Sequence, residues 1–381
     1  MLETMQLTAI PPEDEALRAP VRAFLAEQLK GMSGAKKARS WMGFDAGFSK
    51  ALAAQGWVGL TLPKDYGGGG RSHFARFVLV EELLAAGAPV AGHWVSERQS
   101  APLLLKFGTE DQRRRIVPEV CRGEAFFCIG MSEPDSGSDL ASVRTRADLT
   151  PEGWRVNGSK IWTTHGSRAH YMIALVRTSG TPEDRNKGLS QLLIDMRTPG
   201  VTARPIRDVS GDEHFSEVHF DNALLPADAL IGQEGQGWAQ VNAELAFERS
   251  GPERIYSCMA LIDAWLDFIR AKGPTDAEAE LAGRLLANVS ALRNLSLAVT
   301  ARLARGESPV NEASVVKELG TTWEQTIPGM ITDHLASVEV PVPGDLLAAL
   351  QYAAAMSPSY SLRGGTREIL RGIIARGMGL R

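Results

Sequence analysis

The chain of 381 residues is poor in cysteine and lacks the patterns that mark disulfide-rich and metal-binding proteins. Its three cysteines, Cys121, Cys128 and Cys258, form no Cys-x-x-Cys pair, so we expect no disulfide framework and a reducing compartment. None of the seven histidines stands in a His-Glu-x-x-His pattern. Without Cys or His pairs at ligand spacing, no metal site is expected.

Other absences narrow the class of protein further. No apolar run approaches the ~20 residues that span a bilayer, so no membrane segment is expected. The N-terminal stretch MLETMQLTAIPPEDE has neither the basic nor the apolar region of a signal peptide, and we therefore expect a cytoplasmic protein. The net charge of −4 gives no indication of nucleic-acid binding. No Gly-x-Ser-x-Gly pattern supports a serine hydrolase.

What the chain does contain is a hydrophobic spacing that changes twice. Helical spacing up to about residue 126 gives way to a period of two, and helical spacing returns from about residue 234. Because helices and strands are segregated, this order argues against a doubly wound sheet. We predict an α+β, mainly α, protein with an N-terminal helical domain (1–126), a middle antiparallel β domain (127–233) and a C-terminal four-helix bundle (234–381).

Local signals refine this prediction. Thr109, followed by acids, predicts a helix N-terminus. Asn157-Gly158, inside the alternating stretch WRVNGSKIW, predicts a hairpin turn. Residues 250–253, Ser-Gly-Pro-Glu, lie within a helical pattern and either start a new helix or kink a continuous one. The bundle helices are expected at 237–273, 275–307, 311–337 and from Thr366 onward.

The stretch CIGMSEPDSGSDLASVRTRA concentrates small polar residues. Ser132, Ser136 and Ser138 surround Gly137 in what reads as a tight turn. Such a turn offers backbone N–H and side-chain O–H donors to an anionic or heteroaromatic ligand. On spacing alone, an ordinary polar turn explains the same residues.

The stretch VNGSKIWTTHGSRAHYMIALVRT places an aromatic residue directly before two hydroxyls. Trp162 can stack on a planar ligand while Thr163 or Thr164 bonds the edge of that ligand. On spacing alone, a half-buried strand tryptophan explains the pattern equally well.

Together, the two stretches resemble the Thr-Glu-Pro-x-x-Gly-Ser-Asp and Lys-x-Trp-Ile-Thr-Asn motifs of the acyl-CoA dehydrogenases. The resemblance covers nearly the whole chain, because the family's order is also followed by GWVGLTLPKDYGGGG, GTEDQRRRIVPEVCRGE, GQGWAQVNAELAFER and GGTREILRGIIARGMG. It implies the same three-part fold. It also implies α,β-dehydrogenation of an acyl-CoA thioester to the trans-2-enoyl-CoA, with FAD as hydride acceptor.

The resemblance assigns residues to the cofactor and to the substrate. Cofactor contacts are implied for Ile129, Met131, Ser132, Gly137, Ser138, Trp162, Thr163, Thr164, Thr366 and Glu368. Substrate contacts are implied for Ser138, which would touch the CoA portion, and for Arg249, Gly364 and Gly365.

The catalytic base is missing from its commonest place in the family. Many members carry a Glu directly before the final Gly-Thr, where this chain has Gly364. In isovaleryl-type and long-chain-type members, a Glu of the first bundle helix stands before an Arg, and Glu248-Arg249 matches this arrangement. The resemblance therefore implies Glu248 as the α-proton base, with the backbone N–H of Gly364 bonding the thioester oxygen. It favours branched, cyclic or bulky acyl groups.

Two other family patterns are absent. HLASVEVPVPGDLLAALQYAAAMSPSY replaces the Gln-x-x-Gly-Gly-x-Gly-Tyr motif that binds the adenine side of a neighbouring subunit's FAD, and RAKGPTDAEAELAGR stands where Arg-Phe-Gly is expected. A homotetramer with different FAD contacts and a heterotetramer with a related subunit both stay open. The implied electron acceptor is an electron-transferring flavoprotein. The alternatives are a flavin monooxygenase or oxidase of the same fold and a non-catalytic partner subunit.

Overall fold

The computed structural model describes residues 5–248 and 251–380, with the backbone alone for 244–248. The chain divides into two compact units. The helical unit consists of Met1–Phe44, Arg71–Ala91 and Glu248–Arg381, and the sheet unit consists of Asp45–Gly70 and Gly92–Phe247. The domain boundaries at 126 and 233 stay a prediction.

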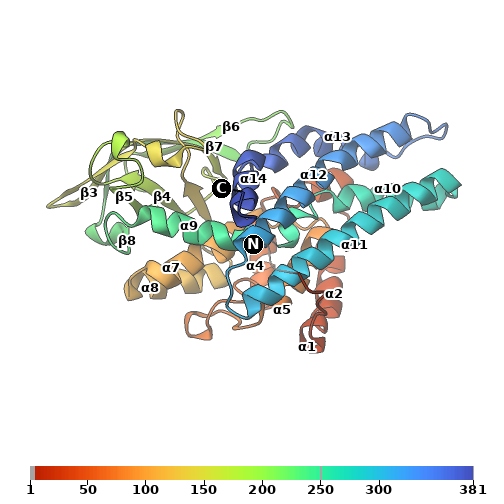
Figure 1. The fold of residues 1–381 in the computed structure, drawn as a ribbon, viewed down its shortest axis with the longest axis horizontal. Helices are drawn as coiled ribbons and strands as arrows, with labels where there is room; N and C mark the ends of the chain where they lie inside the picture. Colours follow the sequence, from red (N-terminus) through yellow and green to blue (C-terminus); the bar gives the residue numbers. More distant parts are fainter. Residues whose placement is uncertain (1–4, 249–250, 381) are drawn as a thin grey trace. The chain divides into compact units, whose positions relative to one another are not determined.

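The helical unit is built around a bundle in which α12 packs against α11, α13 and α14, and α10 packs against α13 (Figure 1). Its elements are α1 Pro12–Glu15, α2 Arg18–Gln28, α3 Gly34–Ala38, α5 His73–Ala85, η6 Pro252–Arg254, α10 Met259–Lys272, α11 Asp276–Ala304, α12 Val310–Leu335, α13 Gly344–Met356, η7 Ser357–Leu362 and α14 Arg367–Gly377. α13 is a helix that the sequence analysis misses, because its Ala-rich stretch follows a Val-Pro-Val-Pro segment.

The helical pattern before α10 is interrupted, so the expected continuous helix with a kink at residues 250–253 is wrong, whereas a short helical element does begin at Pro252. α9 spans Gly237–Glu248. The described residues continue at Gly251, and the short 3-10 helix η6 has Pro252 at its first position. A proline there has no N–H to continue an α-helix. Glu253, buried in η6, pairs with Arg76 of α5 at 2.7 Å. Ser250, expected as a cap, lies outside the described residues.

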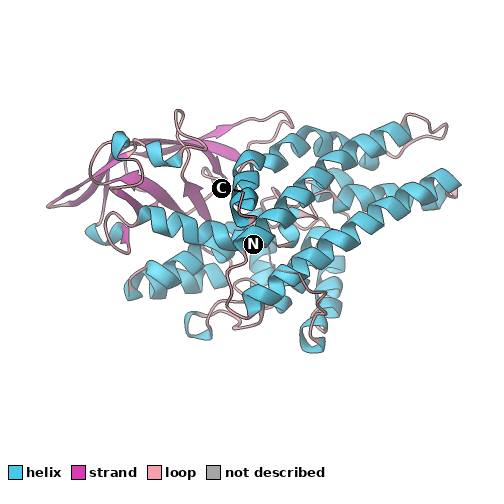
Figure 2. Ribbon diagram, in the orientation of Figure 1, coloured by secondary structure: helices cyan, strands magenta, loops and turns pink. Residues whose placement is uncertain are grey.

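The sheet unit combines helices with a mixed sheet (Figure 2). Its elements are α4 Ala46–Ala54, η1 Lys64–Tyr66, α6 Ala91–Val95, the π-helix η2 Ser96–Ser100, α7 Ala101–Phe107, α8 Glu110–Cys121, β1 Phe127–Gly130, η3 Leu140–Ser142, β2 Arg146–Thr150, β3 Gly153–Thr164, β4 Tyr171–Arg177, η4 Pro182–Asp184, β5 Leu189–Asp195, β6 Val201–Ile206, β7 Phe215–Leu225, η5 Ala227–Ala229, β8 Leu230–Ile231 and α9. Thr109 caps α8 through a reciprocal capping box with Gln112, as predicted.

The strand order is β6-β7-β3-β2-β4-β5-β8, and β1 pairs with β4. The β1–β4 and β2–β4 pairs are parallel, whereas the sequence predicts an antiparallel unit; the remaining pairs are antiparallel. The parallel β1–β4 pair is feasible because a long excursion through β2 and β3 separates the two strands. β4 is buried along most of its length, as a strand covered on both faces should be.

The predicted hairpin turn at Asn157-Gly158 is wrong. Both residues lie inside β3, and the turn between β2 and β3 falls at residues 151–152. Gly158 has a φ of 139°, and the register against β7 shifts between Val156 and Gly158. A Cβ at Gly158 would lie 2.7 Å from the Thr145 hydroxyl. The Asn-Gly pair therefore marks a β-bulge with a close side-chain approach.

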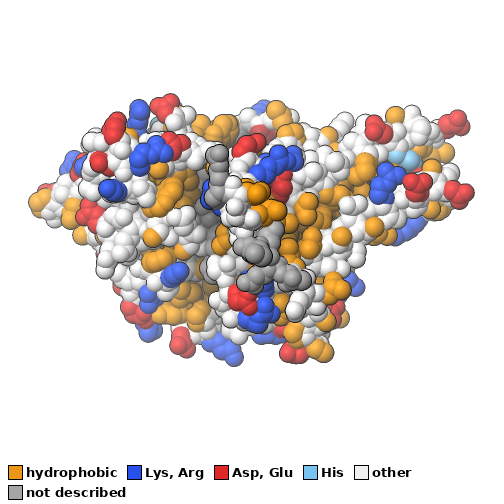
Figure 3. Space-filling model, viewed as in Figure 1, with side chains coloured by type: hydrophobic (Ala, Val, Ile, Leu, Met, Phe, Trp, Pro, Cys, Tyr) orange, Lys and Arg blue, Asp and Glu red, His pale blue; other side chains and the backbone are white. Residues whose placement is uncertain are grey.

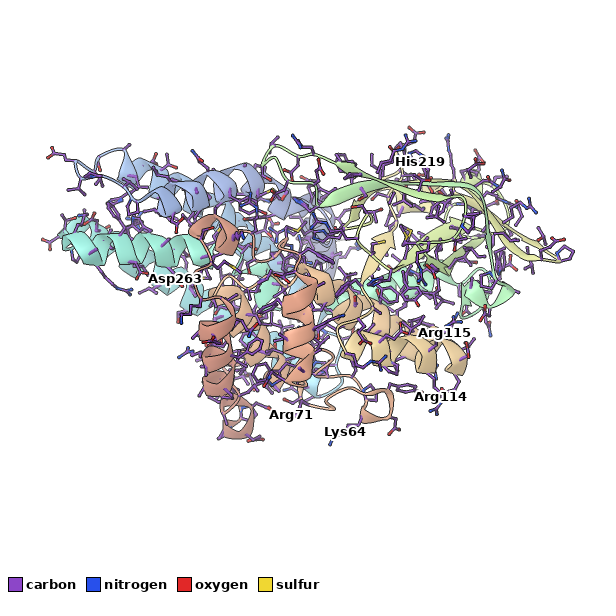
Figure 4. All side chains as sticks on the ribbon, turned by 180° about the vertical axis from the view of Figure 1, so that it is seen from behind. Lys64, Arg71, Arg114, Arg115, His219 and Asp263 are labelled. Carbon is purple, nitrogen blue, oxygen red and sulfur yellow. The ribbon has the colours of Figure 1, made fainter. Side chains whose placement is uncertain are left out.

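Charges of both signs are interspersed on the face drawn in Figure 3. The basic run on α8, of which Figure 4 labels Arg114 and Arg115, is matched by acids one turn earlier: Arg114 pairs with Glu110 at 2.7 Å and Arg115 with Asp111 at 3.7 Å. Such i,i+4 pairs are typical of a solvated helix face. Within the described part of the chain, no helix has the length and apolarity to cross a membrane.

Candidate functional site

The loop after β1 is anchored by the buried side chain of Glu133. One carboxylate oxygen accepts hydrogen bonds from Lys160 Nζ (2.8 Å) and the Thr145 N–H (2.9 Å), and the other accepts from the Arg144 N–H (2.6 Å). Burial acts to raise the pKa of Glu133, but the Lys160 charge and these hydrogen bonds together lower it. The loop therefore has a carboxylate at its base that three protein hydrogen bonds hold in place.

Lys160 is the partner of this carboxylate and has no solvent exposure. Its ammonium also donates to the carbonyl oxygen of Met131 at 3.1 Å. Burial lowers the pKa of Lys160 to about 8, and the Glu133 charge opposes that change. Ile161, the next residue of β3, donates its N–H to the Ser132 carbonyl at 2.9 Å. Residues 131–133 are thus held along residues 160–161.

Beyond Glu133 the loop turns outward. Ser136 is buried, and its hydroxyl donates to the Asp139 carbonyl at 2.7 Å, which closes the turn. Gly137 and Ser138 are exposed, and a Cβ placed on Gly137 would meet no atom within 4 Å. Within the described residues, the hydroxyls of Ser132 and Ser138 make no hydrogen bond. Both hydroxyls are therefore available to a ligand.

The end of β3 holds Trp162 in an unusual state. The residue has a φ of 59° and its side chain is 57% exposed, and its ring meets Phe215 edge-on with 6.0 Å between ring centroids. The register shift between Lys160 and Thr163 places Trp162 in a bulge. Positive φ at a bulky residue costs energy, and such outliers cluster at ligand-binding sites. An exposed ring in this conformation suits a planar ligand.

The two threonines after Trp162 differ in their surroundings. Thr163 is 1% exposed, and its hydroxyl has no partner among the described residues, an arrangement that is costly in an apolar interior. Thr164 is half-buried and pairs with Phe215 of β7. Buried or half-buried hydroxyls beside an exposed indole match the edge and face of a heteroaromatic ring system. The sequence-based choice of Trp162, Thr163 and Thr164 is consistent with this geometry.

In the helical unit, Gly364 and Gly365 form the turn before α14. Their φ angles are 64° and 101°, a region that favours glycine. The carbonyl oxygen of Gly365 accepts a hydrogen bond of 2.9 Å from Lys317, a fully buried residue of α12. Thr366 caps α14 by accepting from the Ile369 N–H, while Glu368 is exposed. The turn is thus held from behind by a buried cation.

Arg363, directly before the turn, links it to the segment that follows η6. Its guanidinium lies 3.9 Å from the centre of the Tyr360 ring, and Nη1 donates to the Ser257 hydroxyl at 3.2 Å. The N–H of Ser257 donates to the buried Glu324 of α12 at 2.5 Å. Burial raises the pKa of Glu324, which the Arg363 charge opposes. One network therefore holds both the turn and the chain after η6.

Two of the remaining predicted residues, Glu248 and Arg249, have no described side chain. Glu248 is the last residue of α9, and its side chain lies outside the described residues, as does all of Arg249. Ile129 and Met131, at the end of β1, are half-buried. Within the sheet unit, the structure brings the loop 129–138 together with residues 162–164. Within the helical unit, it gathers Gly364, Gly365, Thr366 and Glu368.

The cations of these networks, namely Lys160, Lys317 and Arg363, were not singled out by sequence reasoning. For Lys160 a signal exists: it keeps the inward parity of Trp154 and Val156 along β3, so the strand pattern predicts a buried lysine that needs an acid. Lys317 and Arg363 show no comparable local signal. Among the described side chains, no three His, Cys, Asp or Glu residues gather in a way that could hold a metal ion.

The chain has helices in its N-terminal and C-terminal parts and a mixed sheet in its middle part, with a polar loop beside an exposed tryptophan. Comparison with known proteins gives the family. The acyl-CoA dehydrogenase N-terminal domain matches residues 11–124, and the acyl-CoA dehydrogenase middle domain matches residues 128–223. Acyl-CoA dehydrogenase IpdE1 of Mycobacterium tuberculosis is 32% identical over 374 residues, which cover 95% of this chain and 96% of that protein.

Solved structures of similar fold support the same family. The Tcur3481-Tcur3483 steroid ACAD has a TM-score of 0.87 and 27% identity, and the match covers 99% of this chain and 100% of that one. The ChsE4-ChsE5 complex from Mycobacterium tuberculosis has a TM-score of 0.82 and 26% identity, again over 99% and 100%. The chain belongs to the acyl-CoA dehydrogenase family and is an oxidoreductase of that type.

Proposed function

We propose that the protein catalyses FAD-dependent α,β-dehydrogenation of a bulky acyl-CoA thioester to its trans-2-enoyl-CoA, with Glu248 as the α-proton base. The observation that carries this proposal is the turn at Gly364. The commonest base position of the family has no side chain here, and its φ of 64° disfavours any residue that has one. A carboxylate must therefore come from elsewhere, and Glu248 matches the family's other arrangement.

The chemistry explains what each group does. Removing a proton from Cα leaves negative charge on the thioester oxygen, so hydrogen-bond donors aimed at that oxygen lower the barrier. The N–H of Gly364 can fill this role because a backbone donor needs no side chain. The bond from Lys317 to Gly365 fixes the turn that carries this N–H. Glu248 takes the proton, and Arg249 and Gly365 are assigned to the substrate by the family pattern.

The residues of the sheet unit fit a flavin. The hydroxyls of Ser132, Thr163 and Ser138, which make no hydrogen bond to the described part of the chain, offer donors and acceptors, and Trp162 offers an exposed ring. The remaining assigned contacts of this unit are Ile129, Met131, Gly137 and Thr164, and the helical unit adds Thr366 and Glu368. When bound, FAD accepts the hydride that leaves Cβ. The chain's own residues bind it, orient it and keep water from the reacting carbons.

The substrate proposed is a ring-containing, steroid-derived acyl-CoA. One similar solved structure is named a steroid ACAD, and the lack of a side chain at Gly364 leaves room beside the reacting carbons. The Tcur3481-Tcur3483 steroid ACAD and the ChsE4-ChsE5 complex are each named after two proteins. This naming favours a heterotetramer with a related subunit over a homotetramer. Such a partner would supply the adenine contacts that this chain's sequence lacks. An electron-transferring flavoprotein is the proposed electron acceptor.

The proposal is tested by turnover of steroid-derived and linear acyl-CoA substrates with an artificial electron acceptor, for the wild type and for Glu248→Gln. General base catalysis contributes roughly 10²–10⁴-fold, so we expect a loss of that order with the FAD content unchanged. Glu244→Gln, one turn earlier on α9, is the matched control and should keep wild-type turnover. Near-normal turnover of Glu248→Gln contradicts the assignment.

A further inference from the structure

The two flavin-assigned stretches of the sheet unit, 129–138 and 162–164, are joined by one buried ion pair. Lys160 and Glu133 lie at 2.8 Å, and both are buried. Lys160 belongs to β3 two residues before Trp162, and Glu133 follows Ser132 in the loop. The pair therefore connects the strand that carries Thr163 to the loop that carries Ser132 and Ser138. The hydroxyls of these three residues make no hydrogen bond within the described part of the chain.

The pair is more than one contact. The Lys160 ammonium donates both to Glu133 and to the Met131 carbonyl, so it holds the loop at two points. The Glu133 carboxylate receives two backbone N–H groups from residues 144 and 145 in addition. The carboxylate is thus fully occupied, as a buried charge must be.

The register of β3 links this ion pair to the backbone conformation of Trp162. Paired with β7 up to Lys160, the strand then slips by a bulge and resumes pairing at Thr163. Lys160 is the last residue in register before the bulge, so its side chain fixes the point from which Trp162 departs with positive φ. The same ammonium donates to the Met131 carbonyl, and the next residue of the strand, Ile161, donates to the Ser132 carbonyl, so both loop residues are held by this part of β3.

We propose that Lys160 and Glu133 are positioning residues that set the distance between the loop 131–138 and the Trp162–Thr164 segment, and hence the fit of the flavin. The proposal rests on the proposed function only in that FAD occupies this site; it does not depend on the identity of the base. A pair that only stabilised the fold would affect unfolding without a specific effect on FAD. The two roles are separated by measuring FAD affinity at matched loss of stability.

The test compares Lys160→Met with Gln112→Leu in the full chain, purified with its partner subunit if one is required. Gln112 is a fitting control because it is fully buried in the same unit, and its side chain donates to the carbonyl oxygens of Asp228 and Leu230 and to neither of the two flavin-assigned stretches. The dissociation constant of FAD is measured by fluorescence titration of the FAD-depleted protein. Melting temperature is measured on the same samples.

We expect Lys160→Met to weaken FAD binding at least about tenfold, the change that loss of one well-placed interaction gives. Gln112→Leu should lower the melting temperature comparably while its FAD affinity stays within about twofold of wild type. If Lys160→Met does not fold, Glu133→Gln, which preserves side-chain size, replaces it with the same expected outcome. FAD affinity of the tested variant within twofold of wild type, or an equal loss in Gln112→Leu, overturns the proposal.

A second readout does not require FAD. Amide hydrogen exchange of the FAD-free protein should be faster in Lys160→Met at residues 131–138 and 161–164 than in wild type, with β5 and β7 unchanged. The double variant Lys160→Met/Glu133→Gln should weaken FAD binding by clearly less than the two single-variant effects combined, because the two residues act as a unit. Unchanged exchange at 131–138 contradicts the positioning role. The outcome is independent of the Glu248→Gln experiment, in which FAD content is expected to stay constant.

Discussion

The ammonium group of Lys317 donates a hydrogen bond of 2.9 Å to the carbonyl oxygen of Gly365, although 48 residues separate the two along the chain. Lys317 has no solvent exposure, so a charged group lies directly behind the glycine turn. A hydrogen bond from a charged group is stronger than one between neutral groups, and it orients the peptide that it contacts. The geometry of the turn therefore depends on a residue of α12.

Replacing Lys317 with Met should impair catalysis more than binding of FAD. Hydrogen bonds to charged groups contribute about 1.5–3 kcal/mol, so the turn should lose its fixed orientation and kcat should fall about ten- to a hundredfold. Lys272→Met serves as the control, because it removes a half-buried lysine of the same unit whose ammonium pairs with the buried Glu278. Equal kcat for wild type and Lys317→Met would show that the turn does not need this contact.

The conformation of Gly364 predicts the cost of a side chain there. At a φ of 64°, an L-residue costs about 1–2 kcal/mol, so Gly364→Ala should lower the free energy of unfolding by roughly that amount. Gly283 lies inside α11, and a Cβ there meets no atom within 4 Å. Gly283→Ala should instead raise stability by about 0.5–1 kcal/mol. Urea unfolding of both variants gives the comparison; a stabilising Gly364→Ala is incompatible with the described backbone.

Trp162 should show a separation of stability from cofactor binding. Glycine tolerates a φ of 59°, and the relieved backbone strain offsets part of the surface that the half-exposed indole buries, so Trp162→Gly should keep the stability of the FAD-free protein within about 2 kcal/mol. Loss of the aromatic face should weaken FAD binding clearly. Fluorescence titration and thermal melting of the same samples test both parts. A variant that binds FAD like wild type would remove Trp162 from the site.

The lowered pKa of Lys160 predicts how stability changes with pH. Its pKa is about 8 in the folded chain and about 10.4 when unfolded, so between these values the unfolded state binds more protons. Stability from this group therefore rises with pH across that window, by at most about 1.4 kcal/mol per pH unit. Below pH 8 the lysine is protonated in both states and adds no pH dependence. Melting of FAD-free wild type against Lys160→Met/Glu133→Gln, from pH 7 to 10, should show the wild type gaining relative stability; a relative loss has the wrong sign.

Local chemistry made part of the fold predictable. Thr109 caps α8 as expected because a capping box needs only residues within one turn. Asn157-Gly158 misled because the same dipeptide suits both a hairpin turn and a bulge, and the partner strand β7 decides between them. The 3-10 helix η6 is held by tertiary contacts such as that of Glu253 with Arg76. Sequence spacing alone does not contain these contacts.

The candidate site likewise contains residues that the sequence predicts and residues that only the tertiary packing identifies. Trp162 and the serines of the loop were predicted from their type and order, because exposed aromatic and hydroxyl residues are identifiable in the sequence. Lys160 was predictable in principle from its inward position in β3. Lys317 was not, because its role depends on packing α12 against a turn 48 residues later. Long-range buried cations of this kind become visible only once the helices are placed.

The central claim is that a carboxylate at position 248 removes the α-proton, and proton exchange measures that step directly. The acyl-CoA substrate is incubated anaerobically in D₂O with the enzyme, and deuterium at Cα is followed by mass spectrometry. We predict exchange with wild type and with Glu244→Gln, and none above the uncatalysed rate with Glu248→Gln. Exchange by Glu248→Gln at the wild-type rate would contradict the account.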